Sequence, residues 1–380
     1  MGRVDTVSSR IVVLRFPLIV GVVFIHNFMT TVKMAQGPAA TVHTDAWVDF
    51  VRYFISQGLA RVCVPIFFLI SGYLFFLGDW SWEKYGSKLR RRVSTLLVPL
   101  LFWNLASIAI FAIAQAVPAT AVYFAGTAWP PVRSFTALDY GNALLGITKM
   151  PIDYPMWFIR DLIVLVLLAP VIQVFLARRV APLFLVVLAA LWFTGKWPVF
   201  YPSVEATLFF CLGGYLSRFT SSLKKLDKFA PWTSVLFFAG LCASAAIQNS
   251  NLYLHQATIA LGIPSIWWLA GLAARGGRTR IALTWLSTAS FLVFAAHEPL
   301  LTIFRKVAYK VLHPASGVVV LALYLLIPIV LIALLVAANL VLRKIAPRVM
   351  DFVTGSGPRG DAKEIGTGKG ALAIQGGAGK

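Results

Sequence analysis

Residues 11–32 read IVVLRFPLIVGVVFIHNFMTTV, and this apolar stretch decides the kind of fold to expect. About 20 apolar residues are enough for a helix to cross the hydrocarbon core of a bilayer. The charged lead-in, with Arg3 and Arg10, resembles the start of a signal peptide. The length of the stretch and its internal Arg15 instead predict an uncleaved membrane span.

Similar apolar stretches recur along most of the chain. The protein is 59% hydrophobic and 13% charged, with a mean hydropathy of +0.80, whereas an ordinary globular domain has about 25% charged residues. We therefore predict an all-α integral membrane protein with about ten transmembrane helices in one bundle. The further spans are expected at 55–77, 94–116, 157–177, 180–195, 203–217, 232–249, 257–274, 284–304 and 316–342.

The net charge of +20 could indicate a nucleic-acid-binding protein, so the positions of the basic residues matter. They lie between the apolar stretches and alternate between rich and poor loops, as membrane topology requires. We therefore expect contact with membrane lipids and no nucleic-acid partner. Because the basic loops fall on one side of a ten-span chain, both termini are predicted to be cytoplasmic.

Two segments outside the predicted spans stand out. The loop at about 117–155 is the longest connection and could cap an outward-facing cavity; a partly ordered linker is the alternative. We divide the chain into a transmembrane domain, 1–350, and a disordered Gly-rich cytoplasmic tail, 351–380. The three cysteines sit inside apolar segments without metal-ligand spacing, so we expect no metal and no permanently bound cofactor.

Ionisable residues inside membrane spans are costly, which makes them functional candidates. Arg15 and His26 are eleven residues apart, and eleven steps of 100° end about 20° past three full turns. Both side chains therefore share one face of the first helix, roughly 16 Å apart along its axis. Arg15 suits the phosphates of a nucleotide-containing donor, and a neutral His26 can take a proton from an attacking hydroxyl. The alternative is a snorkelling Arg and a packed His.

A basic cluster precedes the third span. Arg90, Arg91 and Arg92 are either a topological signal, with anionic lipids as partners, or a binding site for donor phosphates. Arg61 is predicted to lie on the outward side of the bilayer and is therefore excluded from a cytoplasmic donor site.

Two adjacent pairs are candidates for substrate binding. Arg160 and Asp161 point about 100° apart on a helix, so we expect each to find its partner on another helix. They form either a polar outer vestibule or a structural ion pair between helices. His297 and Glu298 precede Pro299 and could orient an acceptor or assist His26, or could pack at a proline kink.

These residues together resemble the acyltransferase-3 family of bacterial membrane O-acyltransferases, which modify polysaccharides and other envelope glycans. The stretch from Arg15 to His26 looks like the family's Arg, ten residues, His signature. Similar segments follow in RVCVPIFFLISGYL at 61–74, WFIRDLI at 157–163 and SFLVFAAHEP at 290–299.

The resemblance implies that His26 is the catalytic base, that Arg15 is essential, and that Arg90–Arg92 match the family's basic cytoplasmic loop. It implies acetyl-CoA, or another acyl-CoA, as co-substrate. The acceptor would be a sugar hydroxyl of an exopolysaccharide, O-antigen or lipid-linked glycan, and the location the bacterial inner membrane. Some members carry an additional soluble esterase-like domain, whereas only about 30 Gly-rich residues follow the last predicted span here.

A secondary transporter or exporter is the main alternative. Transporters commonly contain two halves related by an internal repeat. The Arg-to-His spacing of the first span has no counterpart near the middle of the chain, which favours the enzyme.

Overall fold

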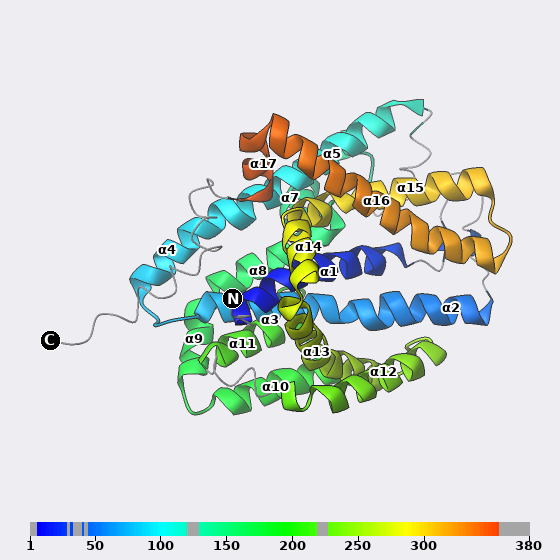
Figure 1. Cartoon of the computed structure of the whole chain (residues 1–380). Coiled ribbons are helices and arrows are strands. Elements are labelled where there is room, and N and C mark those ends of the chain that lie inside the picture. The colour runs from blue at the N-terminus through cyan, green and yellow to red at the C-terminus, as the bar shows by residue number, and fades with distance from the viewer. Residues whose placement is uncertain are drawn as a thin grey trace.

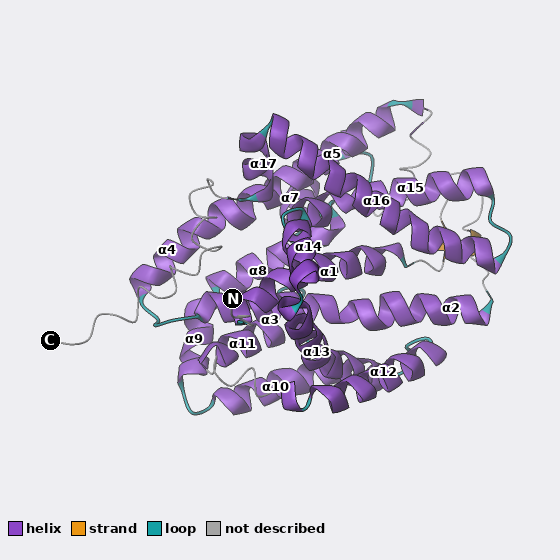
Figure 2. Cartoon of the chain, in the orientation of Figure 1, coloured by secondary structure: helices purple, strands orange, loops and turns teal. Residues whose placement is uncertain are grey.

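The computed structural model describes residues 6–28, 31–32, 40–41, 45–118, 120, 129–218 and 227–356. Within these ranges helices joined by loops and turns make up most of the protein, and the described strands form a small two-stranded antiparallel ribbon (Figure 2). Strand β1 (Thr31–Val32) pairs with β2 (Ala40–Thr41), with Thr31 opposite Thr41. The predicted all-α membrane class is confirmed.

The α-helices are α1 Val7–Asn27, α2 Ala46–Arg52, α3 Cys63–Phe76, α4 Trp82–Arg92, α5 Val98–Ala116, α7 Ala137–Leu145, α8 Trp157–Leu167, α9 Ala169–Ala177, α10 Ala181–Thr194, α11 Val204–Leu216, α12 Ala230–Ala246, α13 Leu252–Arg275, α14 Gly277–Ser287, α15 Ser290–Leu312, α16 Gly317–Ile345 and α17 Pro347–Thr354. Two π-helical segments, η1 Tyr53–Gly58 and η3 Val93–Leu97, and three short 3₁₀ segments, η2 Leu59–Val62, η4 Val132–Ser134 and η5 Tyr154–Met156, complete the described elements.

Each of the ten predicted spans coincides with a helix or a bent pair of helices. Five continuous helical stretches are long and apolar enough to cross a membrane within the described residues: Val7–Asn27, Ala46–Phe76, Trp82–Ala116, Leu252–Arg275 and Gly317–Ile345. Two bent pairs raise this to as many as seven, with bends of 61° between α8 and α9 and 58° between α14 and α15. Helices α10, α11 and α12 are apolar but shorter, so the number of full crossings stays a prediction.

Helix α1 lies in the middle of the bundle (Figure 1). Thr6 and Ser9 form a reciprocal capping box that fixes its first residue, and it contacts α3, α13, α14, α15 and α16. The helix ends at Asn27, so the predicted first span of 11–32 begins too late and extends too far.

The closest helix contact in the bundle joins α3 to α11. A Cβ atom added at Gly72 would lie 2.0 Å from the carbonyl oxygen of Phe210, and one added at Gly213 would lie 2.0 Å from that of Leu69. Only glycine permits such an approach of two backbones, which is how helices commonly pack in membranes. The crossing fixes α11, and with it the residues at its start, relative to α3.

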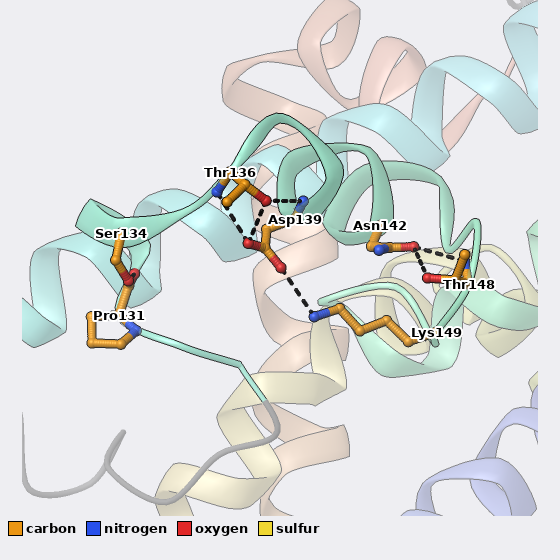
Figure 3. Close-up of polar contacts among 7 residues, drawn as sticks. All are labelled: Pro131, Ser134, Thr136, Asp139, Asn142, Thr148 and Lys149. Atoms are coloured by element: carbon orange, nitrogen blue, oxygen red, sulfur yellow. Dashed lines mark hydrogen bonds and ion pairs between the residues drawn. The ribbon is translucent and has the colours of Figure 1, made fainter.

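The part of the long loop that the structure describes, residues 129–155, contains the short helices η4 and α7 and the start of η5, and is held by side-chain hydrogen bonds. Thr136 and Asp139 cap α7 reciprocally, and Lys149 returns to Asp139 at 3.3 Å (Figure 3). These hydrogen bonds and the nearby Lys149 charge lower the pKa of the Asp139 carboxyl. Asn142 holds Thr148 through hydrogen bonds of 2.7 and 3.1 Å. The alternative of a partly ordered linker does not describe this stretch.

The far end of the chain folds back on the bundle. Helix α17 lies against α5, where the Trp103 indole donates to the carbonyl of Val353 at 2.9 Å. The start of α1, helix α4 and helix α17 lie toward the same side of the bundle (Figure 1). Residues 351–356 of the predicted tail complete α17 and its cap, and 357–380 lie outside the described residues.

Candidate functional site

A cavity of about 800 Å³ runs along α1. Its walls come from α1, α3, α8, α11 and α15, and its ends from segments far apart in the sequence. The lining residues are Arg15, Ile19, Val22, Ile25, His26, Arg61, Val64, Phe67, Arg91, Thr95, Tyr154, Pro155, Trp157, Phe158, Ile159, Glu205, Ser287, Thr288, Ser290, Phe291, Phe294, Arg343, Asp351, Gly355 and Ser356.

Arg15 and His26 both line this cavity, together with residues 19 and 22 between them. The spacing of four, three and four residues follows one face of a helix, so the predicted shared face is confirmed. Arg15 is exposed within the cavity, and His26 is half-buried. The His26 ring nitrogens make no hydrogen bond within the described residues, which leaves them available to a substrate.

The arginines at the basic end of the cavity are not the three of the predicted cluster, Arg90–Arg92. Arg91 lines this end, whereas Arg90 and Arg92 do not, because successive helical residues point about 100° apart. Arg343, at the end of α16, lines the same end and was not singled out in the sequence. Its Nε donates to Asn339 at 3.2 Å, and its Nη1 lies 3.6 Å from the Asp351 carboxylate.

Arg61 is in the cavity too, so its exclusion from the site of Arg15 is wrong. A Cβ atom at Gly21 would lie 2.4 Å from the sulfur of Cys63 and 3.6 Å from Ala60, which places this part of the chain alongside the middle of α1. Arg61 therefore lies at a level between Arg15 and His26. Its Nε and Nη2 both donate to the Gln57 side chain, at 2.9 and 2.6 Å.

The loop before α8 covers the end of the cavity where His26 lies. The Tyr154 ring meets the His26 ring edge-on, with centroids 5.0 Å apart. The neighbouring Asp153 is 2% exposed, and neither carboxylate oxygen has a hydrogen-bond partner within the described part of the chain. Burial, and secondarily the charge of Glu298, raises the pKa of Asp153 well above its ordinary value. The predicted cap over a cavity is therefore present.

His297 lies behind His26 and does not line the cavity. The two rings have centroids 5.2 Å apart. His297 Nδ1 is 2.6 Å from the carbonyl oxygen of Phe294, and a carbonyl can only accept, so Nδ1 carries the proton. In the neutral ring Nε2 is then an acceptor, and it has no partner among the described residues.

Glu298 marks the break in α15, with a non-helical φ of −104° and ψ of 140° just before Pro299. The kink expected at this proline is confirmed. Glu298 is also absent from the cavity wall and instead accepts a hydrogen bond from Thr302 at 3.2 Å. Of the two functional roles predicted for His297 and Glu298, this geometry favours assistance to His26 over direct contact with an acceptor.

Arg160 and Asp161 are buried and do not line the cavity. The expectation that they could not pair with each other is wrong: Arg160 Nε and Nη2 donate to Asp161 Oδ1 at 3.0 and 2.9 Å. The long arginine side chain folds back over the 100° between them. Asp161 also accepts from the backbone of Ser203 at 2.8 Å, so the pair anchors the start of α11 and favours the structural alternative.

Comparison with known proteins agrees with the cavity's chemistry. The family described as an acyltransferase domain, acyltransferase-3, matches residues 9–338. The chain belongs to the acyltransferase-3 family. As an acyltransferase it is an enzyme, and the family membership favours this over the transporter alternative. It is 29% identical, over 95% of each chain, to a protein of Rhizobium meliloti (strain 1021) named succinoglycan biosynthesis protein ExoH.

No solved structure matches this acyltransferase. Among the residues that the structure describes, no group of three or more His, Cys, Asp or Glu side chains could hold a metal ion. The cavity wall carries imidazole, guanidinium, carboxylate and hydroxyl side chains.

Proposed function

We propose that this membrane acyltransferase moves an acyl group from cytoplasmic acyl-CoA to a sugar hydroxyl of an envelope polysaccharide or lipid-linked glycan. The observation that carries the proposal is one cavity with arginines at one end and His26 toward the other, where the His26 ring nitrogens have no hydrogen-bond partner among the described residues. The name of the Rhizobium relative supports a polysaccharide acceptor. Acetyl-CoA is the donor to test first.

The donor phosphates bind at the basic end in this proposal. Arg15, Arg91 and Arg343 line the cavity and can donate charge-assisted hydrogen bonds to phosphate oxygens. The pantetheine arm then extends along α1 toward His26, a distance of roughly 16 Å set by the helix rise. The distribution of Lys and Arg among the loops supports a cytoplasmic position for this end.

The transfer takes place at His26. Its free ring nitrogen removes the proton from the sugar hydroxyl, and the oxygen attacks the thioester carbonyl carbon. As the new C–O bond forms, the C–S bond breaks, and the protonated His26 returns its proton to the CoA sulfur. His297 supports this cycle, because its Nε2 can accept an N–H from His26 and favour the tautomer with the other nitrogen free. No serine or cysteine nucleophile is required.

The proposal is tested by acyl transfer in membranes. Membranes with wild-type or His26→Ala protein are incubated with an exopolysaccharide fraction from which base treatment has removed ester-linked acyl groups. The donor is radiolabelled acetyl-CoA or, in parallel reactions, a longer or a dicarboxylic acyl-CoA. Loss of a general base is expected to reduce the rate by about 10²–10⁴-fold. Label in the glycan with acetyl-CoA alone supports the acetyl donor.

His313→Asn is the matched control. His313 lies outside the cavity and has a positive φ of 42°, a conformation that Asn tolerates. It should transfer at the wild-type rate. Folded His26→Ala protein with activity within a few-fold of wild type would show that His26 is only a packed residue, and an inactive wild type with every donor would overturn the proposed function.

A further inference from the structure

The last turn of α1 is held by side chains from other helices. The final four carbonyl groups of a helix have no partner within it. Here the Ser56 hydroxyl donates to the carbonyl of Phe24, and Arg305 Nη1 donates to that of His26 at 2.7 Å. The backbone of His26 is therefore tied directly to α15.

Arg305 is itself held in place. Its Nη2 donates to the Thr302 hydroxyl at 2.9 Å, and that hydroxyl donates to Glu298 at 3.2 Å. Thr302 and Arg305 are three residues apart and share one face of the helix that resumes after the break, and Glu298 lies at the break itself. Nη1 and Nη2 of the guanidinium thus each have an acceptor, whereas Nε is buried without a partner among the described residues. The two hydrogen bonds give the guanidinium a defined orientation toward α1.

This series of hydrogen bonds starts at Glu298, at the break in α15. His297, immediately before Glu298, packs its ring against that of His26 with centroids 5.2 Å apart. The stretch 297–305 thus contacts His26 twice, at its ring and at its backbone carbonyl. A movement of α15 at this point would displace His26 relative to the cavity.

We propose that Arg305 is a positioning residue for His26, with Thr302 and Glu298 orienting its guanidinium. This rests on the proposed role of His26 as the base. The hydrogen bond is charge-assisted, and a cation at the C-terminal end of a helix is favourable, so the contact fixes where α1 ends. Positioning matters because a displacement of about 1 Å can cost about 10²-fold in rate.

The kinetic consequence differs from that of a donor-binding residue. Arg305→Gln should lower kcat by roughly 10- to 100-fold and leave the KM for acyl-CoA within about twofold of wild type. Arg305→Lys keeps a cationic donor and should recover most of the lost kcat. Thr302→Val removes one orienting hydrogen bond and should give a smaller loss of the same kind.

Lys310→Gln removes a positive charge from the same helix at an exposed position and serves as the matched control. It should leave kcat unchanged, and all variants should show wild-type melting temperatures. The inference is overturned if folded Arg305→Gln retains wild-type kcat, if its loss is mainly in KM, or if Lys does not restore activity. Should Arg305→Gln fail to fold, unchanged kcat in Thr302→Val would overturn it. A wild type without transfer activity would instead refute the proposed function.

Discussion

Replacing Arg91 by Gln tests the donor end of the cavity, because its neighbours provide an internal control. Arg91 lines the cavity, whereas Arg90 is also exposed but does not line it. A unit charge pair about 4 Å apart is worth about 1 kcal/mol in water and about 4 kcal/mol at an effective dielectric constant of about 20. Since Arg91 is exposed, we expect a value near the lower end, about 1–2 kcal/mol.

That energy corresponds to a roughly 5- to 30-fold increase in the KM for acyl-CoA, since about 1.4 kcal/mol is a factor of ten. The assay is the initial rate of acyl transfer at varied donor concentration, in membranes with matched protein levels. The difference from wild type should shrink at high salt, where exposed charges are screened. Equal effects of Arg90→Gln and Arg91→Gln would refute a site-specific role and favour a general attraction between the basic loop and the donor.

Two further predictions concern stability and topology. Because the pKa of Asp153 is raised in the folded protein, the folded protein keeps a proton on Asp153 that the unfolded chain releases near pH 4. The stability of the fold therefore decreases as the pH rises from about 4 through the folded-state pKa of Asp153. Asp153→Asn should flatten this decline in melting temperature and should not lower the melting temperature at pH 7; a drop of several degrees would contradict it. A cytoplasmic reporter fused at Lys344 should be active, and an inactive fusion would refute the predicted cytoplasmic C-terminus.

The sequence predicted well what depends on one helix at a time. Apolar length identified all ten segments as helical, and the 3.6-residue period placed Arg15 and His26 on one face. It also predicted the kink before Pro299. These features follow from local chemistry, and no knowledge of neighbouring helices is needed.

It was less successful where helices meet. Arg305 and Arg343 each follow the last residue of a predicted span, 304 and 342 respectively. The search for ionisable residues inside spans therefore did not include them. Arg61 was assigned by depth alone, whereas its neighbours Ala60 and Cys63 pack against Gly21 and Arg61 itself lines the cavity. For the adjacent Arg160 and Asp161, the direction of the Cα–Cβ bonds was a poor guide because a guanidinium is long enough to fold back.

The glycine crossing of α3 and α11 has a consequence for how the protein is made. Gly72 cannot meet Phe210 until about 140 more residues have been synthesised, and at about 5–20 residues per second this takes roughly 7–28 s. During that time α3 is in the bilayer, or in the insertion machinery, without the partner to which its backbone is fitted. Lipid chains or a chaperone must cover that face first and leave when α11 arrives. Substituting Gly72 by a larger residue would therefore leave α11 without a docking surface at the moment of its insertion.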